Sequence, residues 1–229
     1  MPDIAIVSAL YGDYDNLRNP PPQDGDVECV LVTDNPDIES DVWRIVHRPK
    51  PHMKPRMASK HPRMLPQYYT DAAASIWVDM TIQILSPMFA LEAIECARDG
   101  VATWPHPWNA DLVAEITESL TQPRYQGQLL DDQIVSYFDR GLPGNTGVRH
   151  TAVVARAHNE TTERLGHLWA AELEWSAADQ VSFPWACHVS GVNQYDLPLD
   201  QAFIHGFRTP ARDDAWLSHI PLHLKSYEQ

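Results

Sequence analysis

The sequence predicts one α/β domain, and two kinds of pattern support this fold class. Short runs rich in β-branched apolar residues each end at a polar turn, as at 3–10 and 27–33. Later segments instead repeat apolar residues at helical spacing, as at 109–120 and 159–175. Runs of the first kind predict buried strands and those of the second predict amphipathic helices. Together they indicate a sheet flanked by helices.

The predicted strands lie mostly in the first third of the chain. DIAIVSAL at 3–10 leads into the turn-rich YGDYDNL, and VECVLVT at 27–33 leads into the turn DNPD. WRIVH at 43–47 is shorter, and ASIWVDM at 74–80 is an apolar run interrupted by Asp79. Because strands that end in polar loops place those loops along one edge, we expect the working edge of the sheet at the strand carboxyl ends.

Helices dominate the remainder of the chain. Asn109 and Asn159 each stand at the start of a periodic segment and are candidate N-caps, while Gly100 and Gly141 follow periodic segments as helix ends do. No internal repeat or low-complexity linker divides the chain. The predicted helices are 89–98, 109–120, 125–140, 159–175 and one beginning at 179, with a strand at 148–156.

Composition and charge exclude several classes of protein. The 229 residues are 44% hydrophobic and 21% charged, which is the balance of an ordinary globular domain. The formal net charge of −14 argues against binding of a nucleic-acid duplex or an anionic membrane. A nucleotide diphosphate remains possible, because a divalent cation and a few basic residues can reverse the field inside one cleft.

The cysteines and the first residues bear on the cellular compartment. Cys29, Cys96 and Cys187 are widely spaced and form no CxxC pair, so we expect reduced, buried thiols. The segment MPDIAIVSAL lacks the basic start and the long apolar run of a signal peptide, and no run is long enough to span a membrane. We therefore expect a cytoplasmic protein.

Three features are candidates for chemistry. Asp79 follows a buried strand, where a carboxylate binds a metal ion or instead caps and hydrogen-bonds the next turn. The segment Pro49–Arg63 is the one basic island in the chain and serves either solubility or phosphate binding. His205, in IHGFRTP, is a weaker candidate for a metal ligand. No GxGxxG, GxxxxGK[ST] or GxSxG motif is present, so those sites are not indicated.

The order of several motifs resembles a glycosyltransferase-like family typified by plant mucilage-related and turgor-regulation proteins. The resemblance runs from the first predicted strand to about Trp185. The sequence departs from the family pattern at Thr81, where an Asn is usual, at Leu168, where a Trp is usual, and at Ala178, where an Arg is usual. The motifs are ALYGDYDNL, LVTDN, RMASKHPRMLPQY leading into SIWVDMTIQI, HPWNADLVAEI, and VVARAHNETTERLGHLWAAELEWSAADQVSFPWA.

This resemblance implies a GT-A-like, Rossmann-type mixed sheet with a metal site. A DxD-like element would hold Mn²⁺ or Mg²⁺ between the protein and the two phosphates of a nucleotide sugar. Asp79 would be its principal ligand, with Thr81 at the position of the second ligand. His205, chosen from its own segment, is the third candidate ligand. Hard oxygen ligands such as Asp79 suit these cations.

The resemblance also assigns the donor and reaction sites. Asp179 and Gln180, at a helix start, would lie beneath the anomeric carbon, where a carboxylate orients the acceptor or stabilises oxocarbenium-like charge. Residues 1–86 would form the nucleotide-sugar-binding half, and 87–229 the acceptor half and C-terminal tail. The implied donor-binding residues are Leu10, Tyr11, Gly12, Asp34, Arg56, Lys60 and Asp79.

The implied activity is transfer of a sugar, of the hexosyl type, with retention at the anomeric carbon. A UDP-sugar is the expected donor, and the acceptor is a glycan, a protein or a small molecule. Two alternatives remain at this point. One is a metal-dependent hydrolase of the lipid-amide type, and the other is a non-catalytic module that binds a sugar or a nucleotide.

Overall fold

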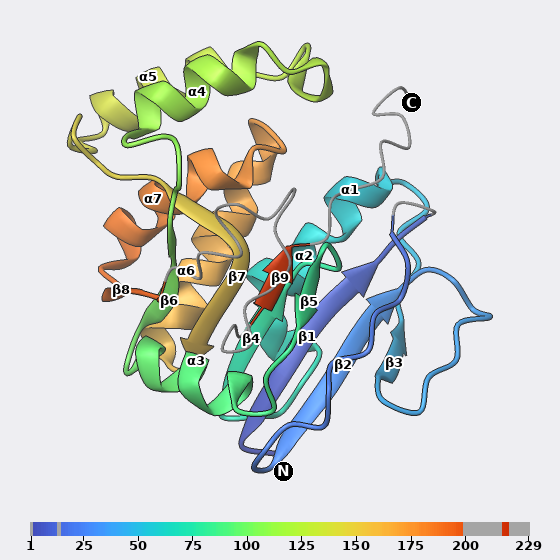
Figure 1. Ribbon diagram of the computed structural model, residues 1–229. Helices are drawn as coiled ribbons and strands as arrows, with labels where there is room; N and C mark the ends of the chain where they lie inside the picture. Colours follow the sequence, from blue (N-terminus) through green and yellow to red (C-terminus); the bar gives the residue numbers. More distant parts are fainter. Residues whose placement is uncertain (1, 13–14, 199–216, 220–229) are drawn as a thin grey trace.

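The computed structural model describes residues 2–12, 15–198 and 217–219, and its centre is a seven-stranded mixed sheet (Figure 1). The strand order is β3-β2-β1-β4-β7-β6-β8. The first four of these run parallel, β7 is antiparallel to both of its neighbours, and β8 is parallel to β6. The strands are β1 (Ile4–Leu10), β2 (Val27–Thr33), β3 (Arg44–His47), β4 (Ala74–Val78), β6 (Val101–Pro105), β7 (Arg149–Ala157) and β8 (Gln194–Asp196).

Helices cover both faces of this sheet, which confirms the predicted α/β fold class (Figure 1). A separate two-stranded antiparallel sheet pairs β5 (Ile82–Ile84) with β9 (Leu217–His219). None of the helices in the described residues combines the length and apolar composition that a membrane crossing requires. The α-helices are α1 (Pro55–Ala58), α2 (Lys60–Met64), α3 (Phe89–Ala97), α4 (Leu112–Leu120), α5 (Leu130–Asp139), α6 (Glu160–Ala171) and α7 (Asp179–Ser190).

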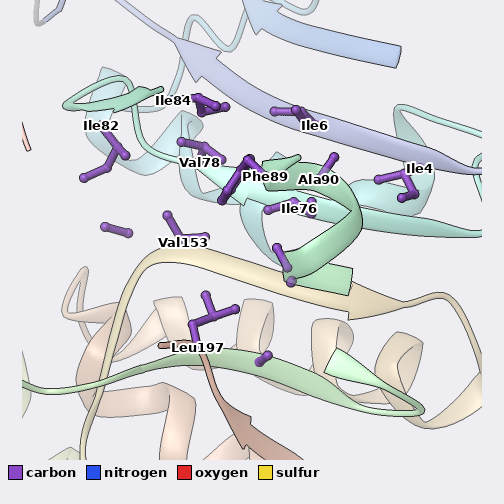
Figure 2. Packing of buried hydrophobic residues seen from close by; sticks show 14 of the residues in the cluster. Ile4, Ile6, Ile76, Val78, Ile82, Ile84, Phe89, Ala90, Val153 and Leu197 are labelled. Carbon is purple, nitrogen blue, oxygen red and sulfur yellow. The ribbon is translucent and has the colours of Figure 1, made fainter. Parts of the chain in front are cut away.

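The alternation of side chains along β1 divides the core between the two faces. Ile4 and Ile6 pack with Ile76 of β4 against Phe89 and other residues of α3 (Figure 2). The intervening residues of β1 point to the opposite cluster, which α2, α6 and α7 cover. Because β1 is buried along its whole length, it is an apolar run interrupted only by Ser8, whose hydroxyl donates to the Val78 carbonyl at 2.6 Å.

The observed helix starts agree only in part with those predicted from the sequence. Asn159 caps α6 as predicted, because its side chain accepts hydrogen bonds from the backbone N–H groups of Thr161 and Thr162. The prediction that Asn109 caps α4 is wrong. Asp111 is the cap and accepts from the Ala114 N–H at 2.9 Å.

Other boundaries also needed correction. The predicted helix 125–140 is a 3₁₀ turn at Pro123–Tyr125 followed by α5, because Gly127 adopts a φ of +74° that ends helical geometry between them. The predicted helix 159–175 ends at Ala171 and continues as a 3₁₀ turn, Glu172–Glu174. Strands β6 and β8, and the helices α1 and α2 within the basic island, were not predicted.

The reversed direction of β7 brings the later half of the chain to the working edge. Asp79 follows β4, and its backbone N–H donates to the carbonyl of Ala152 in β7 at 2.8 Å. The start of β7 and the end of β4 therefore meet at the same edge as the ends of β1 and β2. Side chains from both halves of the sequence are placed next to one another there.

Candidate functional site

The loops that follow β1 and β2 carry the residues that the resemblance assigned to the donor. The Gly12 N–H donates to Oδ1 of Asp34 at 3.1 Å, and the Tyr11 hydroxyl donates to the carbonyl of Arg48 at 2.8 Å. Gly12 has a φ of +62°, a region that glycine adopts without strain. Leu10 and Tyr11 are buried, so their side chains support these loops from within. The structure therefore brings together Leu10, Tyr11, Gly12 and Asp34, as the resemblance implied.

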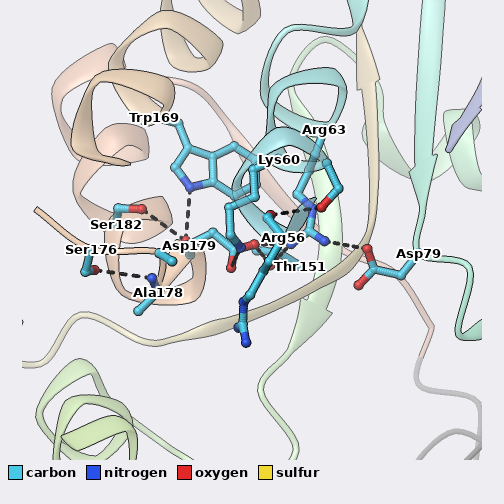
Figure 3. Close-up of polar contacts among 12 residues, drawn as sticks. Arg56, Lys60, Arg63, Asp79, Thr151, Trp169, Ser176, Ala178, Asp179 and Ser182 are labelled. Atoms are coloured by element: carbon cyan, nitrogen blue, oxygen red, sulfur yellow. Dashed lines mark hydrogen bonds and ion pairs between the residues drawn. The ribbon is translucent and has the colours of Figure 1, made fainter. Parts of the chain in front are cut away.

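Arg63 of α2 joins two carboxylates at this edge (Figure 3). Its Nη2 donates to Oδ1 of Asp79, and its Nη1 donates to Oδ2 of Asp179 at the start of α7. Lys60 of α2 contacts the other oxygen of Asp179 through Nζ, and the Thr151 hydroxyl of β7 donates to Oδ2 at 3.1 Å. The site thus connects α2, β4, β7 and α7.

The charges in this cluster determine the protonation of Asp179. Burial alone would raise its pKa, but Arg63 and Lys60 outweigh that effect and hold the pKa of Asp179 well below its usual range. Burial lowers the pKa of Lys60 to about 8, with Asp179 opposing that shift. Asp179 is accordingly ionised, and its oxygens are held by positively charged groups.

Arg56 approaches the cluster from α1. Its Nη2 donates to the Tyr125 hydroxyl at 3.0 Å, and its guanidinium lies over the Tyr125 ring at 5.1 Å from the centroid. Arg56 is among the groups that lower the pKa of Asp179. Sequence reasoning thus placed Arg56, Lys60 and Asp179 in one site, and the structure brings them together.

The remaining predicted residues are less closely tied to the cluster. Gln180 is the second residue of α7 and is half-buried. Thr81 follows the Asp79 turn, and no hydrogen bond in the described residues joins its side chain to Asp79. His205 lies outside the described residues.

Three residues of the site were not singled out by the sequence. Arg63 was only one of five cations in the basic island, and Thr151 stands in an apolar strand with no motif around it. Asp15 belongs to YGDYDNL, and burial together with nearby Asp79 raises its pKa. The spacing of Asp15 and Asp79 along the chain gives no sign of this proximity, which depends on the pairing of β1 with β4.

The described residues offer a metal ion one carboxylate, that of Asp79, so its other ligands would come from the substrate and from water. Oδ1 of Asp79 accepts from Arg63 and from Trp77 Nε1, whereas no hydrogen bond from the described residues reaches its Oδ2. In that part of the chain, no three His, Cys, Asp or Glu side chains gather into a metal site. Mg²⁺ commonly binds one or two carboxylates and completes its coordination with substrate phosphates and water. Asp79 fits that role through Oδ2.

A family model for the TOD1/MUCI70 glycosyltransferase-like domain matches residues 27–195. The chain belongs to this family. The match includes β2, α2, β4, β7 and α7, and the matched range contains Arg63, Asp79 and Asp179. No curated protein matches the chain.

A solved structure shows the same fold. The chain is similar to the apo structure of WbbM, a bifunctional glycosyltransferase, with a TM-score of 0.51 and 12% sequence identity. The similarity covers 87% of this chain but only 39% of the WbbM chain. At this identity the comparison shows an α/β fold resembling that of a glycosyltransferase, and the family match shows a glycosyltransferase-like domain.

Proposed function

We propose that this domain transfers a hexosyl group from a nucleotide sugar, with a UDP-sugar as the donor, to a glycan, protein or small-molecule acceptor. The observation that carries the proposal is Arg63, which is shared between Asp79 on the donor side and Asp179 at the start of α7. Family membership and a fold resembling that of a glycosyltransferase support the same class of reaction.

The charge of the cluster suits a diphosphate leaving group. Arg56, Lys60 and Arg63 lie around Asp179, and Arg63 also pairs with Asp79, while Asp15 lies near Asp79. These three cations and three carboxylates balance one another in a chain whose net charge is −14. Mn²⁺ or Mg²⁺ bound at Oδ2 of Asp79 would add the charge compensation that departure of a nucleoside diphosphate requires. The protein cations would orient the phosphates beside it.

The state of Asp179 favours retention at the anomeric carbon. An inverting transferase needs a general base with a pKa near the working pH to deprotonate the acceptor. Arg63 and Lys60 instead make Asp179 a weak base, and its oxygens are engaged by those cations. Asp179 then serves to position the cations and to stabilise positive charge on the reacting sugar.

The test is calorimetric titration of the chain with a panel of nucleotide sugars, with and without Mn²⁺. We expect Asp79→Asn to weaken Mn²⁺-dependent donor binding at least about tenfold, because the carboxylate oxygen left for the cation is lost. Asp41→Asn, at an exposed loop position, is the matched control. A melting curve of each variant without ligand separates loss of binding from loss of folding.

Unchanged donor affinity of Asp79→Asn in Mn²⁺ would refute the role of Asp79. With a turned-over donor, NMR of the product reports the anomeric configuration, and inversion would contradict the argument from Asp179. Donor binding without transfer to any acceptor in the panel would favour a non-catalytic binding module.

A further inference from the structure

Trp108 is exposed, whereas most of the other tryptophans in the described residues are buried. Of the tryptophans in the described residues, only Trp108 is classed as exposed, with 62% of its surface accessible. Trp77, Trp104 and Trp169, by contrast, are almost completely buried. An indole left in water forgoes the stabilisation that burial of its apolar surface would give, so Trp108 presents an apolar face to a ligand that packs on it.

The loop that carries Trp108 is held in place by hydrogen bonds. The His106 ring packs edge-on against Trp108 with centroids 5.8 Å apart, and His106 Nδ1 accepts from the Asn109 N–H at 2.9 Å. The Asn109 side chain donates to Glu115 at 2.6 Å and to Glu118 at 2.8 Å. The loop is thereby fastened to α4, and the indole stands on a supported base.

The sheet topology places this loop beside the reaction site. Trp108 follows β6, and β6 lies two strands from β4, which precedes Asp79. With strands about 4.8 Å apart, this is roughly 10 Å along the edge, about the span of one or two sugar rings. His150, next to the Asp179 partner Thr151 in β7, packs on His106 at 5.9 Å.

The order along the edge separates the two sides of the site. The donor-side loops follow β1 and β2, whereas Asp179 meets β7 and Trp108 follows β6 on the far side. A group that approaches Asp179 from the direction of β6 therefore comes from the side of the sheet on which the Trp108 loop lies.

We propose that Trp108 is the stacking platform for a sugar ring of the acceptor, an inference that rests on the proposed transferase function. The apolar C–H face of a pyranose packs on the exposed indole, while its hydroxyls point outward to polar groups. Glu118, an exposed carboxylate beside the loop, supplies an acceptor for those hydroxyls. The acceptor is thus a carbohydrate in preference to a protein or a small apolar molecule.

The experiment measures glycan binding and donor binding separately. The full chain is applied to a printed array of defined oligosaccharides and, labelled with 5-fluorotryptophan, is titrated by ¹⁹F NMR with the glycans that bind. Trp108→Phe identifies the Trp108 signal. Tyr68→Ala is the matched control, because Tyr68 is an exposed aromatic residue that precedes β4, at the opposite edge of the sheet.

We expect the wild-type chain to bind a subset of glycans and the Trp108 signal to shift on titration. Trp108→Ala should weaken that binding about 3- to 10-fold, the effect of losing one aromatic stacking contact, and Trp108→Phe should stay within about twofold. Tyr68→Ala should bind as wild type, and donor affinity should be unchanged in Trp108→Ala.

Two results would overturn the inference: a wild-type chain that binds no glycan on the array, or a Trp108→Ala variant that binds glycans as wild type does. Glycan binding at Trp108 without any nucleotide-sugar binding would support the stacking role and refute the transferase. The two proposals therefore fail separately.

Discussion

Asp179→Asn should be strongly destabilising, because it removes the counter-charge of two buried cations. Lys60 is 3% exposed, Arg63 is 8% exposed and Asp179 itself is 5% exposed, so solvent cannot replace the lost carboxylate. Arg63 would keep Asp79 as a partner, whereas Lys60 would face only an amide. The substitution is nearly isosteric, so the effect reports charge and not packing.

The expected magnitude follows from the burial of the pair. Removing one partner of a buried ion pair costs about 3–5 kcal/mol in the free energy of unfolding. For a domain of this size, that corresponds to a fall of roughly 6–20 °C in melting temperature. Urea denaturation gives the free energy of unfolding, and a thermal melt gives the second measure.

A second substitution tests the cause. Asp179→Asn combined with Lys60→Met removes the uncompensated charge, so most of the lost stability should return. Asp196→Asn is the control, because Asp196 pairs with Arg149 at the surface, where an ion pair contributes little. If Asp179→Asn melted within about 2 °C of wild type, or if the double variant were the less stable of the two, the electrostatic reasoning would be refuted.

Two further predictions concern stability. Burial, with Arg156 nearby, lowers the pKa of His158 from 6.5 to about 4. Between these pH values the unfolded chain binds a proton at this histidine and the folded chain does not, so the free energy of unfolding falls as the pH falls from 6.5 to about 4. Between pH 7 and pH 4.5, His158→Asn should lose about 2 kcal/mol less unfolding free energy than wild type, allowing for partial exposure. Urea denaturation at both pH values measures this, and equal losses in the two proteins would contradict the prediction. A Cβ on Gly166 of α6 would lie 2.3 Å from the Met64 carbonyl oxygen of α2, so Gly166→Ala should lower the free energy of unfolding by about 1–3 kcal/mol. Gly144→Ala is the control, because a Cβ there meets no neighbour within 4 Å. Equal effects of the two substitutions in urea denaturation would contradict the contact.

The sequence predicted the elements whose patterns are local. The β-branched run at 3–10 and the capping pattern of Asn159 each determine structure through near neighbours, and both are confirmed. The helix start at Asp111 was missed because Asn109 is an equally good cap in isolation. Asn109 instead bonds to Glu115 and Glu118 in the following helix, a preference that appears only in three dimensions.

The candidate site was predicted as a set of residues but not as a network. Asp79, Lys60 and Asp179 were each chosen for separate contacts with the donor, the metal or the acceptor. The structure places Arg63 between Asp79 and Asp179, which are separated by 100 positions in the sequence. No periodicity or spacing predicts that contact, because it depends on the antiparallel insertion of β7 beside β4.

The shared guanidinium makes the two carboxylates interdependent. Any change that frees Asp79 from Arg63 alters the charge that Asp179 experiences, and the converse also holds. Groups that act through a common partner give non-additive effects when they are replaced together. Under the proposed function, a diphosphate that attracted Arg63 would therefore alter the environment of Asp179, where the sugar would react. The coupling would then let a bound donor change the charge at Asp179 without any movement of the sheet.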